Sequence, residues 1–223
     1  MNIAVISDTH LNTSFSQSKC ETLQRIIRSV DLVVLNGDFW DGYEITFDQF
    51  LQSRWSVLFP LLKEKHAVYV FGNHDKESFS DDRRLQFCDH ATHKHTIDHA
   101  DKHYVFEHGD QYVWKIDKVL KITRPVLWLN AVTEWIQKSF IQTVGIKGFW
   151  LLFGKMNRAI KRHVRKAGYH NPNTVFFCGH THCAEIDLKN SFVNTGVFKY
   201  GYAQYALIHA DGSVTLKDTL YKR

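Results

Sequence analysis

Proline is scarce in this chain, with three residues among 223, and no stretch rich in glycine and serine interrupts it. Linkers between domains commonly have such a composition, so composition places no boundary inside residues 1–223. A chain of this length can bury a sizeable core as one unit. We therefore expect one soluble domain, with any further element inserted into it.

Cysteine is also scarce, with four residues scattered at Cys20, Cys88, Cys178 and Cys183. Small secreted domains use dense cysteines as disulfide staples, and a chain of this length does not need them. Cys178 and Cys183 flank two histidines, so a structural zinc site is one interpretation. The other, which we favour, is that Cys178 ends a buried strand.

Long apolar runs are missing altogether. No uninterrupted stretch is long enough to span a bilayer, and the first ten residues lack the basic and apolar regions of a signal peptide. These absences predict a cytoplasmic protein, with peripheral contact to a membrane surface left open.

Acidic residues are missing from one long segment. Residues 135–184 contain eight Lys or Arg and no Asp or Glu, whereas the rest of the chain carries 20 basic and 23 acidic residues. This asymmetry predicts an anionic partner for the basic segment.

Short apolar runs alternate with helical patterns in the first third of the chain. Ile3–Ser7, Leu32–Asn36 and Ala67–Phe71 predict buried strands, and helices are predicted around Lys19–Arg28 and over Phe47–Lys65. The alternation predicts βαβ units with parallel strands. Functional sites of such sheets collect at the carboxyl ends of the strands.

The last quarter of the chain favours antiparallel pairing. Strands are predicted at Thr174–Cys178, Glu185–Leu188 and Phe192–Asn194. Gln204–His209 and Ser213–Leu216 flank an Ala-Asp-Gly turn and predict a hairpin. Mixed sheets are therefore expected rather than a purely parallel one.

Residues 93–110 predict another hairpin, in which a strand through Ile97 pairs back through Tyr104–Glu107. Five histidines lie in or beside it: His90, His93, His95, His99 and His103. A metal site is one interpretation. A solvated hairpin is the other, and we favour it because no carboxylate or cysteine recurs at ligand spacing.

Residues 112–168 predict a helical insertion with two apolar stripes. The first comprises Trp128, Val132, Trp135, Ile136 and Phe140, and the second comprises Phe149, Leu152, Phe153, Met156, Ile160 and Val164. Basic residues lie opposite the second stripe. We interpret the insertion as a lid that contacts an amphiphilic, anionic substrate or a membrane surface, with Arg158, Arg162 and Trp128 as substrate-binding residues. The alternative is that both stripes pack internally and the basic face is merely solvated.

Five short motifs, each directly after an apolar run, carry the chemistry. They are Asp8-Thr9-His10, Gly37-Asp38, Gly72-Asn73-His74-Asp75, His108-Gly109-Asp110 and Gly179-His180-Thr181-His182. Side chains two residues apart on an extended strand end face the same side. Mixed nitrogen and oxygen ligands suit divalent Mn, Fe, Co or Zn, and two such ions can clamp a phosphoryl group. The motifs therefore predict a phosphoester hydrolase with two divalent metals.

In these motifs and their order, the chain resembles the calcineurin-like metallophosphoesterases over nearly its whole length. The resemblance implies an α/β fold, a four-layer α/β/β/α sandwich with two mixed sheets and the helical insertion. It implies a first metal held by Asp8, His10 and His182, with Asp38 as a bridge, and a second held by Asn73, His108 and His180. It also implies that His74 faces the substrate phosphate and that Asp75 orients it. We expect Mn²⁺ in both sites, with Fe or Zn as alternatives.

A narrower resemblance is to the UDP-2,3-diacylglucosamine pyrophosphohydrolases. It rests on residues 37–43, Gly-Asp-Phe-Trp-Asp-Gly-Tyr, on the His108 motif and on the helical insertion. The chain departs from well-studied members at His74, where they have Arg. The resemblance implies a phosphodiester or pyrophosphate substrate of the UDP-sugar-lipid type.

Four rival functions remain open at this point. A nucleotide phosphodiesterase or polyphosphate hydrolase would use the same motifs, as would a protein phosphatase. A metal-free scaffold is less favoured, because this chain retains every position of the motif set. Nucleic acid is a less favoured partner, because the aromatic residues lie on apolar stripes rather than beside the basic ones. The sequence does not indicate an oligomeric state.

Overall fold

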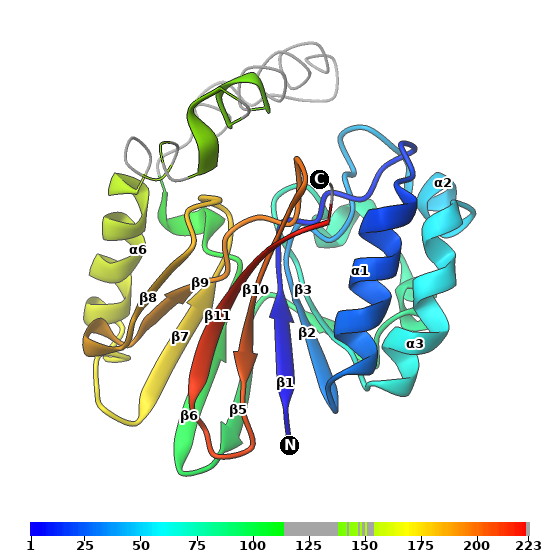
Figure 1. The fold of residues 1–223 in the computed structure, drawn as a ribbon. Coiled ribbons are helices and arrows are strands. Elements are labelled where there is room, and N and C mark those ends of the chain that lie inside the picture. Colours follow the sequence, from blue (N-terminus) through cyan, green and yellow to red (C-terminus); the bar gives the residue numbers. More distant parts are fainter. Residues whose placement is uncertain (114–137, 142, 147, 149, 151–153, 222–223) are drawn as a thin grey trace.

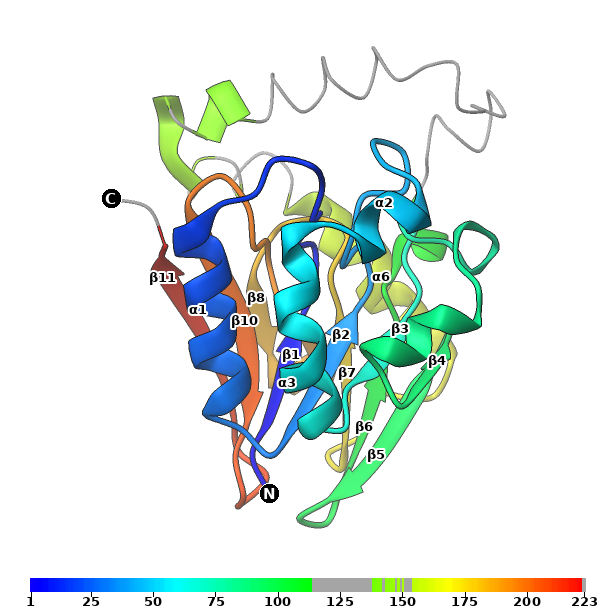
Figure 2. The same cartoon turned by 90° about the vertical axis from the view of Figure 1, so that its right-hand side faces the viewer.

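Two β-sheets lie face to face with helices on their outer faces (Figure 1). The structure is a computed structural model and describes residues 1–113, 138–141, 143–146, 148, 150 and 154–221. Figure 2 shows α1 and α3 in front of one sheet, and α6 on the far side of the molecule.

The first sheet has six strands in the order β11-β10-β1-β2-β3-β4. Strands β1 to β4 are parallel to one another, whereas β10 and β11 are antiparallel to their neighbours. Their bounds are Ile3–Ile6 (β1), Leu32–Asn36 (β2), Val68–Val70 (β3), His90–Thr92 (β4), Tyr202–Ile208 (β10) and Val214–Leu220 (β11).

The second sheet has five strands in the order β5-β6-β7-β9-β8. Strands β6, β7 and β9 are parallel, and antiparallel strands lie at both edges. The bounds are His95–His99 (β5), Lys102–Phe106 (β6), Thr174–Cys178 (β7), Glu185–Asp187 (β8) and Phe192–Asn194 (β9). The mixed sheets that the sequence predicts are confirmed.

The α-helices differ from expectation in one place. They include Gln17–Arg28 (α1), Phe47–Leu51 (α2), Phe59–Glu64 (α3) and Lys155–Lys166 (α6). The single helix predicted over residues 47–65 is wrong, because the chain breaks after α2 into a short 3-10 helix, Arg54–Leu58, and then α3. Ser53 caps the 3-10 helix through its side chain, and Pro60 lies in the first turn of α3, where its missing N–H is tolerated.

Three apolar layers hold the sandwich together, because side chains alternate along each strand. Ala4, Ile6, Val33 and Leu35 face the layer under α1 and α3. Ile3, Val5, Val34, Tyr104, Phe106 and Phe177 face the layer between the sheets. Val105, Phe176 and Phe192 meet Ile160 and Val164 of α6 in the third layer. Helix, sheet, sheet and helix therefore follow one another, which is the four-layer α/β/β/α arrangement.

The predicted hairpins are present, and the histidine-rich one carries no metal group in the part of the chain that the structure describes. Its histidines make local contacts, such as His103 Nδ1 to Asp98 Oδ1 at 2.7 Å. Cys178 is the last residue of β7 and is buried, as favoured, and both Cys178 and Cys183 are free thiols outside the candidate metal groups.

The predicted insertion at residues 112–168 lies partly outside the described residues. In its described part, Ile160 and Val164 pack on the second sheet. Ile141 and Ile146 form a separate cluster with Cys183 and Val197. Among the described residues, no helix has the length and apolar character that crossing a membrane requires.

Candidate metal centre

The five motifs meet at one end of the sandwich, because each follows the carboxyl end of a parallel strand. Within each sheet, neighbouring loops are tied by backbone hydrogen bonds: the N–H of His10 donates to Asp38 O at 2.9 Å, and the N–H of Gly179 donates to His108 O at 3.0 Å. Between the sheets, the N–H of His180 donates to the Asp8 carboxylate at 3.0 Å. Residues far apart in the sequence are thereby brought to one site.

The backbone at these loops is strained. Ten described residues other than glycine have a positive φ, and five of them are predicted metal ligands: Asp8, His10, Asp38, His180 and His182. Such conformations are uncommon for residues with a Cβ and persist where the surroundings enforce them, often at functional sites. Their concentration here agrees with a site built for ligand geometry rather than for stability.

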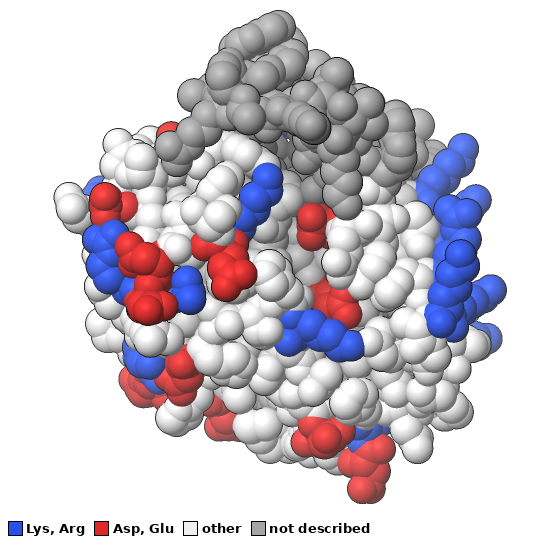
Figure 3. Space-filling view, turned by 180° about the vertical axis from the view of Figure 1, so that it is seen from behind, with Lys and Arg blue, Asp and Glu red and all other residues white. Residues whose placement is uncertain are grey.

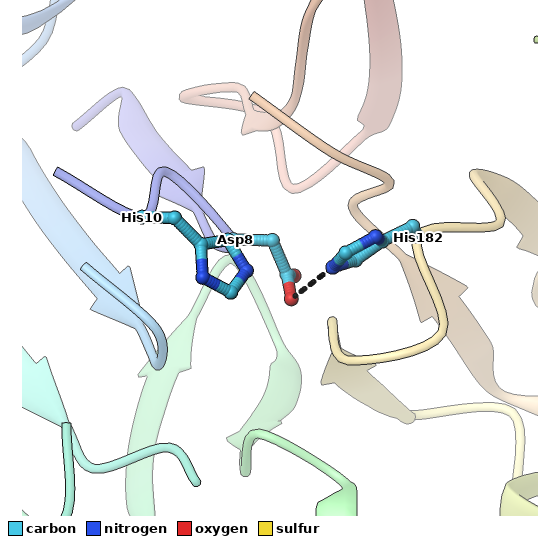
Figure 4. Close-up of side chains that lie close together, drawn as sticks. All are labelled: Asp8, His10 and His182. Carbon is cyan, nitrogen blue, oxygen red and sulfur yellow. Dashed lines mark ion pairs between the residues drawn. The ribbon is translucent and has the colours of Figure 1, made fainter. Parts of the chain in front are cut away.

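Asp8, His10 and His182 form the first group, with ligand atoms within 4.8 Å of one another. Figure 4 shows the three side chains converging, with His182 Nε2 3.3 Å from Asp8 Oδ1. Ser7 Oγ also donates to the Asp8 carboxylate and lies 2.6 Å from Thr195 Oγ1. The Asp8 side chain is therefore fixed before any cation binds.

Asp38, His108 and His180 form the second group, again within 4.8 Å. His108 Nδ1 lies 3.0 Å from the carbonyl oxygen of Asn36, so this nitrogen is the donor and Nε2 is left for a ligand. Asn73, from the loop after β3, is 8% exposed.

Asp38 lies between the two groups. Its Oδ2 is 3.8 Å from His10 Nε2 in one group and 3.2 Å from His108 Nε2 in the other. Its Oδ1 accepts the N–H of His74 at 2.8 Å, which fixes the carboxylate. Asp38 is thus within 4 Å of candidate ligand atoms of both groups.

Two atoms of these residues are buried without a hydrogen-bond partner, His10 Nε2 and Asn73 Oδ1, and His108 Nε2 has only the Asp38 carboxylate beside it. Buried polar atoms are nearly always satisfied, and an exception calls for an explanation. Imidazole nitrogens and an amide oxygen are ligands that divalent transition metals accept. The residues therefore fit two cations.

His74 is oriented by a residue that the sequence analysis did not select. We expected Asp75 in this role, and that expectation is wrong: His74 Nδ1 lies 3.1 Å from Asp41 Oδ1. The same carboxylate places Oδ2 3.3 Å from His10 Nδ1. The Asp75 carboxylate instead accepts the backbone N–H groups of Gly72, Asp38 and Phe39, at 2.7, 3.0 and 2.6 Å. Asp75 thus joins the loops after β2 and β3.

Charges in the site set the protonation of its histidines. Burial, with the charges of Lys199 and His74, lowers the pKa of His10 to about 4, so its ring is neutral. Burial opposes charge on His74 as well, but Asp38 and Asp41 outweigh it and raise the pKa of His74 to about 9. A neutral His10 suits a metal ligand, and a cationic His74 suits an anionic phosphate.

The carboxylates respond to the same cluster. Burial opposes ionisation of Asp38, but the charges of His108 and His74 hold its pKa well below the ordinary value. For His108, burial is outweighed by Asp38 and the pKa rises to about 10. Because metal ligands must be deprotonated, a cation bound here would displace that proton. For Asp75, burial and the neighbouring Asp38 raise the pKa to about 7.

Two motif glycines are required by close packing against the ligands. A Cβ on Gly72 would collide with Asp38 Oδ1 and the Asp38 backbone nitrogen. A Cβ on Gly179 would collide with the Asp8 carboxylate and Ser7 Oγ. These glycines therefore let one loop approach the carboxylate of the next.

The predicted substrate-binding residues are not among the groups described above. Arg158 and Arg162 are exposed on α6, beside a hollow of about 560 Å³ that Lys155, Lys161 and Arg165 also line. Trp128 lies outside the described residues. Their role in substrate binding stays a prediction.

Asp41 was not among the site residues predicted from the sequence. It follows Asp38 by three positions and is 1% exposed. The sequence feature that could have identified Asp41 is a second carboxylate only three residues after a predicted ligand. No such feature marks Ser7 or Thr195, because hydroxyl residues beside strand ends are common.

Comparisons with known proteins bear on the family and on the fold. The family profile described as calcineurin-like phosphoesterase matches residues 1–184. A sequence search of the curated proteins finds no match. The structure is similar to wild-type Vps29 complexed with Zn²⁺ from Entamoeba histolytica, with a TM-score of 0.50 at 14% identity over 100% of both chains. It is also similar to YfcE, a phosphoesterase from E. coli, with a TM-score of 0.47 at 16% identity over 100% of both chains. The likeness to Vps29 shows a shared fold.

Proposed function

This chain belongs to the calcineurin-like phosphoesterase family, and from that premise we propose that it hydrolyses phosphodiester or pyrophosphate bonds with two divalent metal ions. The single observation that carries the proposal is the position of Asp38. Its Oδ2 lies between His10 and His108, which belong to different groups of candidate ligands. A purely structural carboxylate would not need candidate ligands of two groups around it.

The residues divide naturally between two cations. Asp8, His10 and His182 would hold the first, Asn73, His108 and His180 would hold the second, and Asp38 would contact both. Mn²⁺ is the ion we propose first, with Fe or Zn as alternatives. Bound there, such ions polarise phosphoryl oxygens and lower the pKa of water to supply a nucleophile.

His74 would act on the substrate directly. Its Nδ1 faces Asp41, so the proton on Nδ1 is held by that carboxylate and Nε2 is left for the substrate. From Nε2, the ring would donate a hydrogen bond to a phosphoryl oxygen or a proton to the leaving group. Asp75 would contribute indirectly, by holding the loop after β3 against the loop after β2.

Metal analysis and a simple turnover assay test the proposal together. The purified protein should contain or take up close to two equivalents of Mn²⁺, and should hydrolyse an aryl phosphodiester in its presence. A protein that binds no metal and cleaves no aryl phosphodiester would be the scaffold alternative. Activity on phosphotyrosine peptides or nucleoside polyphosphates, without activity on the diester, would move the substrate to those rival classes.

We further propose that the substrate is amphiphilic and anionic, of the UDP-sugar-lipid type, and that α6 contacts it or a membrane surface. Figure 3 shows Lys and Arg side chains gathered at one edge of the molecule, on the side where α6 lies. The exposed basic residues of α6 are Lys155, Arg158, Arg162, Arg165 and Lys166. Basic residues near an anionic lipid surface favour binding.

The substrate proposal has its own test. Turnover of a lipid-linked nucleotide diphosphate should exceed turnover of its water-soluble headgroup under matched conditions. Equal turnover would favour the internal-packing interpretation of the insertion. The cytoplasmic location, with peripheral membrane contact, is proposed with this substrate and depends on it.

A further inference from the structure

Asn157 is a polar residue on the buried face of α6. It is 1% exposed, and the other buried residues of that helix, Ile160 and Val164, are apolar and pack in the third layer. An apolar side chain would serve packing equally well. A buried amide is costly unless its hydrogen bonds are made, so its partners show what this residue does.

All polar atoms of the Asn157 side chain are engaged. Nδ2 donates to the carbonyl oxygen of Cys183 and to Glu185 Oε2, both at 2.9 Å. Oδ1 accepts the hydroxyl of Thr181 at 2.7 Å and Nδ2 of Asn194 at 3.1 Å. One side chain of α6 thus contacts the loop after β7 at two points.

Thr181 is the residue between the two histidine ligands of that loop. Its Oγ1 also accepts the N–H of Cys183 at 3.3 Å and Nδ2 of Asn194 at 3.0 Å. Asn194 continues to the carbonyl oxygen of Gly179 at 2.8 Å. One buried hydrogen-bond network, formed by Asn157, Thr181 and Asn194, therefore holds the loop from Gly179 to Cys183.

The network lies beside two residues whose backbone conformation is unfavourable. His180 and His182 have φ values of +65° and +57°. Residues in this region persist only where surrounding structure enforces them. Loss of the Thr181 contact would let both histidines relax, because Thr181 is the neighbour of each.

We propose that Asn157 is a positioning residue: it fixes the loop of residues 179–183 and so orients His180 and His182, one ligand of each proposed metal. The claim for the metals rests on the proposed function, whereas the claim for the loop does not. Through Glu185, whose other oxygen accepts Lys161 Nζ, the network reaches the outer part of α6. The last helix of the insertion therefore contributes to the site without touching it.

Variants that keep volume but remove hydrogen bonds test this. Asn157→Leu removes the amide, and Thr181→Val removes only the hydroxyl. Thr181→Ser retains the hydroxyl and is the matched rescue. Val164→Ala is the control for simple loss of packing, because Val164 lies on the same buried face of α6 and outside the network.

Two readouts are compared in each variant: amide hydrogen exchange over residues 179–183 in the metal-free protein, and affinity for Mn²⁺ by calorimetry. Asn157→Leu and Thr181→Val should speed the exchange and weaken Mn²⁺ binding about 10–100-fold, the usual effect of losing a group that orients a ligand. Thr181→Ser should stay close to wild type in both readouts. The double variant should bind Mn²⁺ no more weakly than the more affected single variant, because both substitutions break one network.

Unchanged exchange in Asn157→Leu, or equal losses in Val164→Ala, would overturn the proposal. If Asn157→Leu does not fold, the contrast between Thr181→Val and Thr181→Ser decides the question alone. If the wild-type protein binds no Mn²⁺, the proposed function fails, and the exchange data still support or overturn the role of Asn157 in the loop.

Discussion

The Asp41 carboxylate holds the His74 imidazole, with Oδ1 3.1 Å from Nδ1. The two residues come from loops after neighbouring parallel strands, β2 and β3. Because the second oxygen of Asp41 lies 3.3 Å from His10 Nδ1, one carboxylate fixes both a candidate metal ligand and the candidate substrate-binding ring. The position of the proposed substrate-binding ring and that of the candidate metal ligand therefore depend on the same carboxylate.

His74→Asn should lower turnover by about 10²–10⁴-fold, the usual contribution of a general acid or base. His74 lies with His10 and Asp41 in a third group of candidate ligand atoms, but it is not one of the ligands proposed for either metal, so metal content should be unchanged. If His74 protonates the leaving group, an aryl ester with an acidic phenol should recover part of the loss. Steady-state kinetics over a series of leaving groups measure this.

Equal losses across that series would show that His74 only stabilises charge on the phosphoryl group. Loss of metal together with turnover would contradict its placement outside the ligand set.

Asp38→Asn should weaken both metals at once, because Asp38 Oδ2 lies between His10 and His108. We expect affinity losses above the roughly 10–100-fold that follow removal of a group outside the ligand shell. Metal titration by calorimetry measures this, with exposed Asp218→Asn as the charge-matched control. If Asp38→Asn keeps full metal content and turnover, the proposal that Asp38 contacts both metals is wrong.

Metal removal should destabilise the protein, since cations that bind only the folded state stabilise it by mass action. At 100 times its Kd, one ion adds about 2.7 kcal/mol, or about 5–10 °C in Tm for a domain of this size. Thermal unfolding with Mn²⁺ and with EDTA should differ by at least that amount. Asp38→Asn should abolish the difference and His74→Asn should keep it. If EDTA does not change the Tm of a metal-loaded sample, the result would argue against metal sites formed by buried ligands.

The strands, and the placement of the five motifs at strand ends, could be predicted from the sequence because both depend on local signals. Short apolar runs such as Leu32–Asn36 give a strand its bounds, and the polar residues directly after them give the site. The helix expected over residues 47–65 failed because helical spacing of apolar residues continued through Ser53, where a side-chain cap starts a new helix. Spacing alone does not show such a break.

Partners within the site were harder to predict, because they depend on tertiary contacts. Asp75 adjoins His74 in sequence, yet the turn directs its carboxylate to backbone N–H groups and leaves the His74 ring to Asp41. The contact between Asn157 and Thr181 joins residues 24 apart, one in α6 and the other in the loop after β7. No local pattern distinguishes such an asparagine from a solvated one on a basic helix.

Lys161 offers a test of pH-dependent stability away from the metal centre. Its Nζ contacts Asp187 Oδ2 at 2.5 Å and also Glu185. The hydrogen bond from Lys161 lowers the pKa of Asp187. Stability from a lowered carboxyl pKa is present at neutral pH and is lost as pH falls through the lowered value.

Lys161→Met should therefore reduce the free energy of unfolding at pH 7 by about 0.2–1 kcal/mol, the range for ion pairs near the surface. The difference from wild type should shrink once the pH falls below the ordinary carboxyl value of 3.8. Urea denaturation across this pH range measures it, with exposed Lys189→Met as control. A difference independent of pH would assign the effect to lost packing of the lysine stem.

Charge reversal on α6 tests the proposed contact with a membrane surface. Arg158 and Arg162 are exposed on consecutive turns of a helix whose buried face packs on the second sheet. Each basic residue near an anionic surface contributes about 1 kcal/mol, so neutralising two would weaken binding by about 30-fold. Arg158→Glu/Arg162→Glu should exceed that loss, because it adds repulsion.

The matched control is Arg25→Glu/Arg28→Glu on α1, which changes the net charge equally on the opposite side of the sandwich (Figure 1). Sedimentation with liposomes containing phosphatidylserine should capture wild type and this control at low salt, and release both at high salt, since surface electrostatics are screened. The α6 variant should stay in solution. If both variants lose binding equally, attraction follows net charge rather than the basic face of α6. If the wild-type protein ignores the liposomes, the anionic partner of this helix is a soluble substrate, and the lipid-linked substrate becomes the less favoured one.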